Sequence, residues 1–184
     1  MGNHSKNVFI ARLAILVSLT VGIQLAGLPQ PITGPMINAL LLLTAALVGV
    51  IAGITLGCLT PLLALIRGQL PAILAPMVPF IAVGNALLVL TFFLIYRAKS
   101  SGRAESDWQM YAGLIAAAVV KFVFLLLSAR HLLQLIFDYE IPDTFIVMMS
   151  TPQLITALAG GAIAAALLKI IKRSDMFKSF SAHS

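Results

Sequence analysis

A single lysine, Lys121, lies within the otherwise apolar stretch between Trp108 and Ser128. A stretch of roughly 20 such residues is long enough to cross a bilayer as a helix. An ammonium group near the middle of a spanning helix costs at least about 2.5 to 3.5 kcal/mol, and such groups usually face a bundle interior or a watery cavity and have a partner there. The pattern therefore predicts that Lys121 binds a polar ligand. A lysine that reaches the interface or bonds helix carbonyls is the alternative.

Four carboxamide residues are the other candidates for a polar site. Asn85 lies at about the same membrane depth as Lys121 if each residue advances a helix by about 1.5 Å. Gln24, Asn38 and Gln153 lie near helix ends at the same membrane surface. The alternatives are an interhelical amide bond for Asn85 and contact with interfacial water for the other three. Together with Lys121, they predict a substrate-binding site in one half of the membrane.

The composition predicts an integral membrane protein. The chain has 184 residues, of which 60% are hydrophobic and only 10% are charged, and its mean hydropathy is +1.05. A soluble domain of this size needs many more charges to cover its surface. We therefore expect the chain to be surrounded by membrane lipid, with no length left for a soluble catalytic domain.

Catalytic chemistry and a bound metal are not expected. The sequence has no phosphate-binding G-x-x-x-x-G-K-[ST] loop, no H-E-x-x-H helix and no Ser and His placed for burial together. The single Cys58 excludes an internal disulfide, and the three histidines are scattered over the termini and a loop. We predict that the protein is not an enzyme and holds no cofactor, so that any ATP used in transport is hydrolysed by partner subunits.

Six apolar stretches, each near the length of a spanning helix, make up a single domain of residues 1–184. Glycine, proline and charged residues mark the breaks between them, including a tight turn near Gly49. The predicted helices are residues 8–28, 35–48, 50–67, 76–96, 108–131 and 152–171. The expected fold is an all-α polytopic bundle of six transmembrane helices.

Basic residues are distributed unequally between the two ends of this predicted bundle. In membrane proteins generally, such residues accumulate in cytoplasmic loops. With the N-terminus inside, only Arg67 and Arg130 fall outside. The inner side then carries Lys6, Arg12, Arg97, Lys99, Arg103, Lys169, Lys172, Arg173 and Lys178. Both termini are therefore expected in the cytoplasm, with the polar site in the outer half. The net charge of +6 is explained as an orientation signal, and no nucleic-acid partner is expected.

Small residues recur every four positions along three of the predicted helices. In the first helix they are Ala14, Ser18, Gly22 and Ala26, in the third Gly49, Gly53 and Gly57, and in the sixth Ala157, Gly161 and Ala165. Such a stripe lies on one helix face and allows another helix to approach closely. Packing within the chain and docking of a partner subunit are both explanations of this pattern.

The outer connection between the last two helices, residues 138–150, is predicted to act as a lid. Its apolar run from Ile141 to Met149 is unusual for a solvated loop, and Pro142 and Asp143 can begin a short helix. Such a helix would lay apolar side chains over the outer cavity. A merely solvated loop is the alternative.

Four segments carry a resemblance to a known family. They are Thr33-Gly-Pro-Met-Ile-Asn-Ala-Leu-Leu-Leu, Thr60-Pro-Leu-Leu-Ala-Leu, Pro79-Phe-Ile-Ala-Val-Gly-Asn-Ala-Leu-Leu-Val and Thr151-Pro-Gln-Leu-Ile-Thr-Ala-Leu. In the order of these segments, its size and its six-helix pattern, the whole chain resembles the substrate-binding S components of energy-coupling factor (ECF) transporters.

The resemblance implies a high-affinity substrate-binding subunit of an ABC importer in a prokaryotic cytoplasmic membrane. Such a subunit captures a vitamin or related micronutrient from outside, and it assembles with a transmembrane T subunit and two ATPases. In the family, the pocket lies in the outer half, and helix 1 docks the T subunit through an Ala-x-x-x-Ala-like motif. The matching ridge here is Ala14-Ile-Leu-Val-Ser18, in which serine replaces the second alanine, and Ala11 and Gly22 add small positions.

The buried lysine also bears on the chemistry of the substrate. A lysine at pocket depth suits a ligand with a carboxylate or phosphate, which favours a pantothenate-like or biotin-like acid over a neutral thiazole or pyrimidine. Cobalamin, riboflavin and others remain open, since S components share a fold and not a ligand chemistry. A stand-alone secondary transporter or channel for a small polar solute is the alternative function. Such proteins usually contain internal repeats, and no convincing repeat is present in the sequence.

Overall fold

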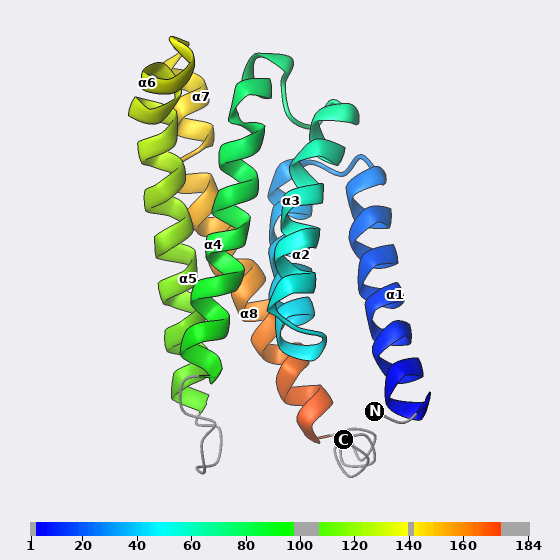
Figure 1. Ribbon diagram of the computed structural model, residues 1–184. Helices are drawn as coiled ribbons and strands as arrows, with labels where there is room; N and C mark the ends of the chain where they lie inside the picture. The colour runs from blue at the N-terminus through cyan, green and yellow to red at the C-terminus, as the bar shows by residue number, and fades with distance from the viewer. Residues whose placement is uncertain (1–2, 98–106, 140–141, 174–184) are drawn as a thin grey trace.

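The structure is a computed structural model of the chain, and it describes residues 3–97, 107–139 and 142–173. Within these ranges six long helices form one bundle (Figure 1). Their bounds are α1 Asn3–Leu25, α2 Gln30–Leu47, α3 Val50–Ile66, α4 Val78–Arg97, α5 Asp107–Leu127 and α8 Thr151–Arg173. Four short segments are a 3₁₀ helix at Ala72–Met77, a π-helical turn at Ser128–Leu132, α6 at Leu133–Phe137 and α7 at Asp143–Met148. The predicted all-α bundle agrees with this architecture.

Within the described residues, five helical segments are long and apolar enough to cross a membrane. They are Lys6–Leu25, Gln30–Leu47, Ala72–Tyr96, Trp108–Phe137 and Asp143–Ile171, whereas α3 is a shorter apolar helix of 17 residues. These lengths and compositions are those of a membrane-embedded protein. Figure 1 shows that α1 begins and α8 ends at the same end of the bundle.

The central helix of the bundle is α2, which packs against α1, α3, α4 and α8. Every residue from Ile37 to Ala45 is buried, including Asn38 and Thr44. A helix that is apolar on all sides is surrounded by other elements, as this one is. By contrast, α1 lies at one edge of the bundle (Figure 1) and contacts mainly α2 and α3. Polar groups on α2 are therefore forced to find partners inside the bundle.

The structure corrects the predicted boundaries at the first two helices. The first helix ends at Leu25 and not at residue 28, because Gly27 adopts a positive φ of 71° and Pro29 follows. The second helix begins at Gln30 and not at residue 35. Pro31 lies in its first turn, where a proline loses no helical hydrogen bond, and Pro35 lies inside the helix. The predicted break at Gly49 is confirmed, and its φ is 145°.

The fifth predicted helix is longer than residues 108–131. A π-helical turn at Ser128–Leu132 inserts an extra residue into the helix, which then continues as α6 to Phe137. The fourth predicted helix is preceded by a 3₁₀ helix, Ala72–Met77, and the short helix expected after Pro142 is confirmed as α7. Lys99, Arg103, Glu140 and Lys178, which bear on the topology and the lid, lie outside the described residues.

Two helices of the bundle approach so closely that only glycine fits between them. A Cβ atom at Gly160 of α8 would lie 2.6 Å from the Pro35 carbonyl oxygen and 2.7 Å from the Cβ of Asn38. One at Gly34 of α2 would lie 2.9 Å from a methyl group of Thr156. These glycines hold α2 and α8 in near-backbone contact, and they place Asn38 at the crossing.

A substitution at this crossing is expected to destabilise the protein. Gly160→Ala adds a methyl group against the α2 backbone, and overpacking of this kind costs typically about 1 to 3 kcal/mol. Gly22→Ala on α1 is the matched control, because nothing lies within 4 Å of its Cβ position and alanine is the better helix former. Thermal melting in detergent should show a lower midpoint only for Gly160→Ala. Equal midpoints would show that the close approach is dispensable.

Candidate ligand-binding site

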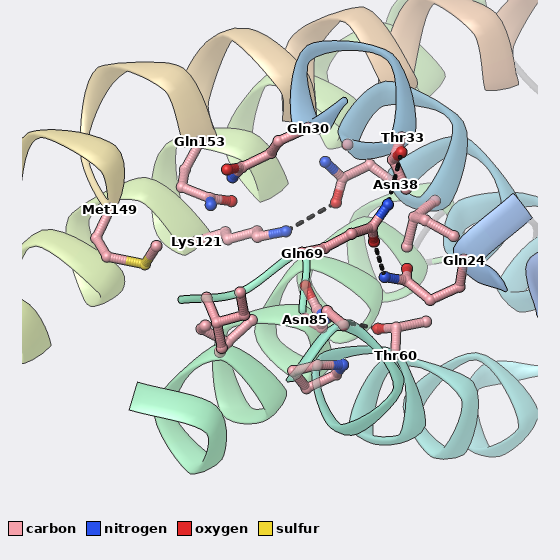
Figure 2. Close-up of a pocket in the computed structure, with 16 residues that line it drawn as sticks. Gln24, Gln30, Thr33, Asn38, Thr60, Gln69, Asn85, Lys121, Met149 and Gln153 are labelled. Atoms are coloured by element: carbon pink, nitrogen blue, oxygen red, sulfur yellow. Dashed lines mark hydrogen bonds between the residues drawn. The ribbon is translucent and has the colours of Figure 1, made fainter. Parts of the chain in front are cut away.

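A cavity of about 110 Å³ opens among the helices, and each of the six long helices contributes to its wall (Figure 2). Its lining combines one lysine, six carboxamides and two threonines with small or aliphatic residues. These residues are Gln24, Gln30, Thr33, Gly34, Ile37, Asn38, Thr60, Pro61, Ala64, Gln69, Leu70, Ile81, Asn85, Lys121, Met149 and Gln153. All five predicted substrate-binding residues therefore lie around a single cavity.

Lys121 is 3% exposed and reaches from α5 to the central helix. Its Nζ donates a hydrogen bond of 2.7 Å to Oδ1 of Asn38, which is itself buried (Figure 2). A lysine ammonium has three N–H donors, so this contact leaves two of them for the cavity. The partner is a neutral amide and not an acid. Asn38 therefore orients the ammonium group without neutralising it.

No carboxylate compensates this charge among the described residues that line the cavity. The acidic residues of the chain are Glu105, Asp107, Asp138, Glu140, Asp143 and Asp175. Of those that the structure describes, Asp107 and Asp143 open α5 and α7, and Asp138 follows α6. A buried charge without a counter-charge is costly, and an anion in this cavity would offset that cost.

Asn85 makes an interhelical hydrogen bond, which was the alternative role considered for it from the sequence. Its Nδ2 donates to the carbonyl oxygen of Gly57 at 2.9 Å and lies 3.2 Å from Oγ1 of Thr60. Pro61 explains this contact, since proline has no N–H to donate to the carbonyl four residues before it, which is that of Gly57. Asn85 thus ties α4 to α3 by satisfying the freed carbonyl, while its side chain also lines the cavity.

Gln24 is buried and joins a cluster of bonds at the end of α1. Its Nε2 donates to Oε1 of Gln69 at 2.5 Å, and Nε2 of Gln69 donates to the Leu28 carbonyl at 2.8 Å. Beside it, Nε of Arg67 donates to the Leu25 carbonyl, the last residue of α1, at 3.0 Å. These bonds link the connection after α3 to the connection after α1 and close one wall of the cavity.

Gln153 and Gln30 supply the two free amides of the site. In the described chain neither side chain makes a hydrogen bond, although Gln153 is only 8% exposed. No fully enclosed side-chain nitrogen or oxygen there lacks a partner, so both amides must open onto the cavity. Figure 2 shows Gln30, Gln153 and Lys121 directed toward the same space.

Sequence reasoning missed Gln30 and Gln69 as cavity residues. Both belong to short connections or helix starts at the same end of the bundle as Gln24, and this shared position was the available signal. A second helix that starts at residue 35 leaves Gln30 in a loop, whereas Gln30 is the first residue of α2. Gln24, Asn38 and Gln153 are all buried and line the cavity, so they do not lie on the outer surface of the bundle.

The small-residue stripes face in different directions. The stripe on α1 is exposed at Ala11, Ala14, Ser18 and Gly22, and internal packing is therefore excluded for these positions. The buried positions of α1 are instead Leu16, Thr20 and Gln24. On α3, Gly53 and Gly57 pack against α4, and on α8 the residues Ala157, Gly161 and Ala165 are buried. The α1 stripe is the one left available to a partner.

The short helix α7 packs at the end of the bundle where α8 begins. Phe145, Ile146 and Met148 contact a core cluster that includes Leu74 and Leu133, and Met149 lines the cavity. The predicted placement of apolar side chains beside the cavity agrees with this packing, while motion of the segment as a lid stays a prediction. In the described ranges no group of three or more His, Cys, Asp or Glu could hold a metal ion.

Comparisons with protein-family models, curated proteins and solved structures find no match for this chain. The likeness to ECF S components depends on the segments quoted from the sequence, and it stays a prediction.

The role of Pro61 in the Asn85 contact is testable by a double-mutant cycle. Asn85→Ala is expected to cost about 1 kcal/mol, since a buried carbonyl loses one of its donors. In a Pro61→Ala background the cost should fall toward zero, because residue 61 then has an N–H for the Gly57 carbonyl. Detergent-unfolding curves of the four proteins measure the coupling. The same cost in both backgrounds would contradict this explanation.

Proposed function

We propose that this chain is the substrate-binding membrane subunit of an ECF-type importer and that it captures a small anionic micronutrient from outside the cell. The observation that carries the proposal is the Lys121 ammonium in an amide-lined cavity, hydrogen-bonded to the neutral Asn38. A binding subunit needs such a preformed polar pocket within an apolar bundle. A membrane enzyme would in addition need a nucleophile, a metal or an acid–base pair at the same place.

The orientation proposed is six spans with both termini in the cytoplasm. The start of α1 and the end of α8 lie at one end of the bundle (Figure 1), as an even number of spans requires. Basic residues such as Lys6, Arg12 and Lys169 occur toward that end, where the positive-inside rule expects them. Gln24, at the other end of α1, and Met149, after α7, line the cavity, which then faces outward.

The proposed partners are a transmembrane T subunit and two ATPases, which supply the ATP-driven step. Support comes from α1, which lies at the bundle edge and exposes Ala14, Ser18 and Gly22. Outside the adjoining part of α1 itself, no atom of the described residues lies within 4 Å of a Cβ position at Gly22, so a second helix has room to approach its backbone. Small side chains with an exposed backbone suit a close contact with another transmembrane helix.

Lys121→Met is expected to weaken ligand binding by roughly 10- to 100-fold, which is the contribution of a charge-assisted hydrogen bond. The measurement is the affinity for the solute that mass spectrometry identifies in the purified protein. Lys169→Met is the matched control, since Lys169 lies near the far end of α8 and does not line the cavity. Unchanged affinity in a folded Lys121→Met protein would remove Lys121 from the site.

Leucine at both Ala14 and Ser18 is expected to block assembly with a T subunit while solitary ligand binding persists. A close helix crossing cannot accept branched side chains at its contact point. Ala162→Leu makes the same kind of change on an exposed position of α8 and serves as the control. Co-purification of the complex at normal yield would refute docking through α1. Uptake by the chain in cells that lack the ATPases would instead indicate a stand-alone transporter.

A further inference from the structure

The cavity has the charge balance of a site for a single negative charge. Among the described residues that line it, Lys121 is the one charged side chain. A carboxylate matches this ammonium one to one. A phosphate monoester carries about −1.5 to −2 charges near neutral pH, so part of its charge would stay uncompensated in an apolar bundle. The lining therefore favours a monocarboxylate.

The free hydrogen-bonding groups describe the rest of the ligand. Two N–H donors of Lys121 remain after its bond to Asn38, and they suit the two oxygens of one carboxylate. The amides of Gln153 and Gln30 have no partner in the described structure and open onto the same space (Figure 2). Each amide both donates and accepts hydrogen bonds, as hydroxyl and amide groups of a ligand do. A plain hydrocarbon chain would leave both amides unsatisfied.

The apolar part of the lining is aliphatic. It includes Ile37, Ile81 and Met149, and no Phe, Tyr or Trp of the described chain lines the cavity. A flat heteroaromatic ligand would thus find no aromatic ring on which to stack. The cavity volume of about 110 Å³ gives room for a compact molecule.

From this combination we infer that the ligand is a compact aliphatic monocarboxylate that bears hydroxyl or amide groups. The carboxylate binds Lys121, and the polar substituents bind Gln153 and Gln30. Asn38 acts as a positioning residue, because it holds the ammonium group in place without cancelling its charge. This inference rests on the proposed binding function of the cavity, and it narrows the substrate to one chemical class.

A panel of matched compounds tests the class on the wild-type protein in lipid nanodiscs. The acids are glycerate, 3-hydroxybutyrate and N-acetyl-β-alanine, each compared with its primary carboxamide. Benzoate, 4-hydroxybenzoate and nicotinate are the aromatic acids, and glycerol 3-phosphate is the phosphate. Saturable thermal stabilisation is expected from at least one aliphatic acid, with its carboxamide weaker by on the order of 10-fold or more. Equal binding of the carboxamide, tighter binding of an aromatic acid or of the phosphate, or no binding by any aliphatic acid would overturn the inference.

Asn38→Asp tests the charge argument separately. The change keeps the shape of the side chain and places a carboxylate beside Lys121, so the cavity loses its net positive charge. Affinity for the responding acid is expected to fall by roughly 10-fold or more. Asn7→Asp makes the same change at an exposed position of α1 and should have no effect. Full affinity in a folded Asn38→Asp protein would show that the cavity charge does not select the ligand.

The two levels of the proposal fail in different ways. If the aliphatic acids bind and Asn38→Asp abolishes their binding, but no T subunit or ATPase is needed for uptake, the ligand class stands and the importer function fails. If ATPase-dependent uptake is found for an aromatic or neutral solute, the importer function stands and the ligand class fails.

Discussion

The constraint on which the rest of the structure depends is a positive charge inside an apolar bundle, with no buried acid among the described residues. An ammonium group in such surroundings needs hydrogen-bond acceptors, and the bundle brings it one from Asn38. Six of the ten Asn and Gln residues of the chain line the same cavity. Buried hydroxyls elsewhere, such as those of Thr20 and Thr44, bond to carbonyls of their own helices. Strong polarity is thus gathered at one place in the bundle.

The position of Asn38 depends on the close packing of α2 against α8. Gly160 allows the backbone of α8 to contact that of α2. Gly34, one turn before Asn38, leaves space for the side chain of Thr156 from α8. Any larger residue at these two positions would push the helices apart and move the amide away from α5. The electrostatics of the cavity therefore depend on two glycines whose only contribution is close approach.

Carboxamide side chains serve two purposes in this bundle, and the backbone beside them decides which. Asn85 satisfies the carbonyl that Pro61 leaves free, so its donors are used between helices. Gln24 and Gln69 bond to each other and join the ends of α1 and α3. Gln153 and Gln30 meet no such backbone group, and their amides remain for a ligand. The wall formed by Gln24, Gln69 and Asn85 is therefore held by hydrogen bonds within the protein, while the amides of Gln153 and Gln30 are not.

Residue types and hydrophobic length by themselves determined that the chain is an all-helical, membrane-type bundle with one buried base. The break at Gly49 and the short helix after Pro142 were also predictable, because glycine and proline act locally on the backbone. Tertiary structure alone decided the partner of Lys121, since residues 83 positions apart along the chain meet only after packing. It also decided which small-residue stripe stays exposed. The three stripes share one spacing, and burial depends on the neighbour each helix meets rather than on the pattern it carries.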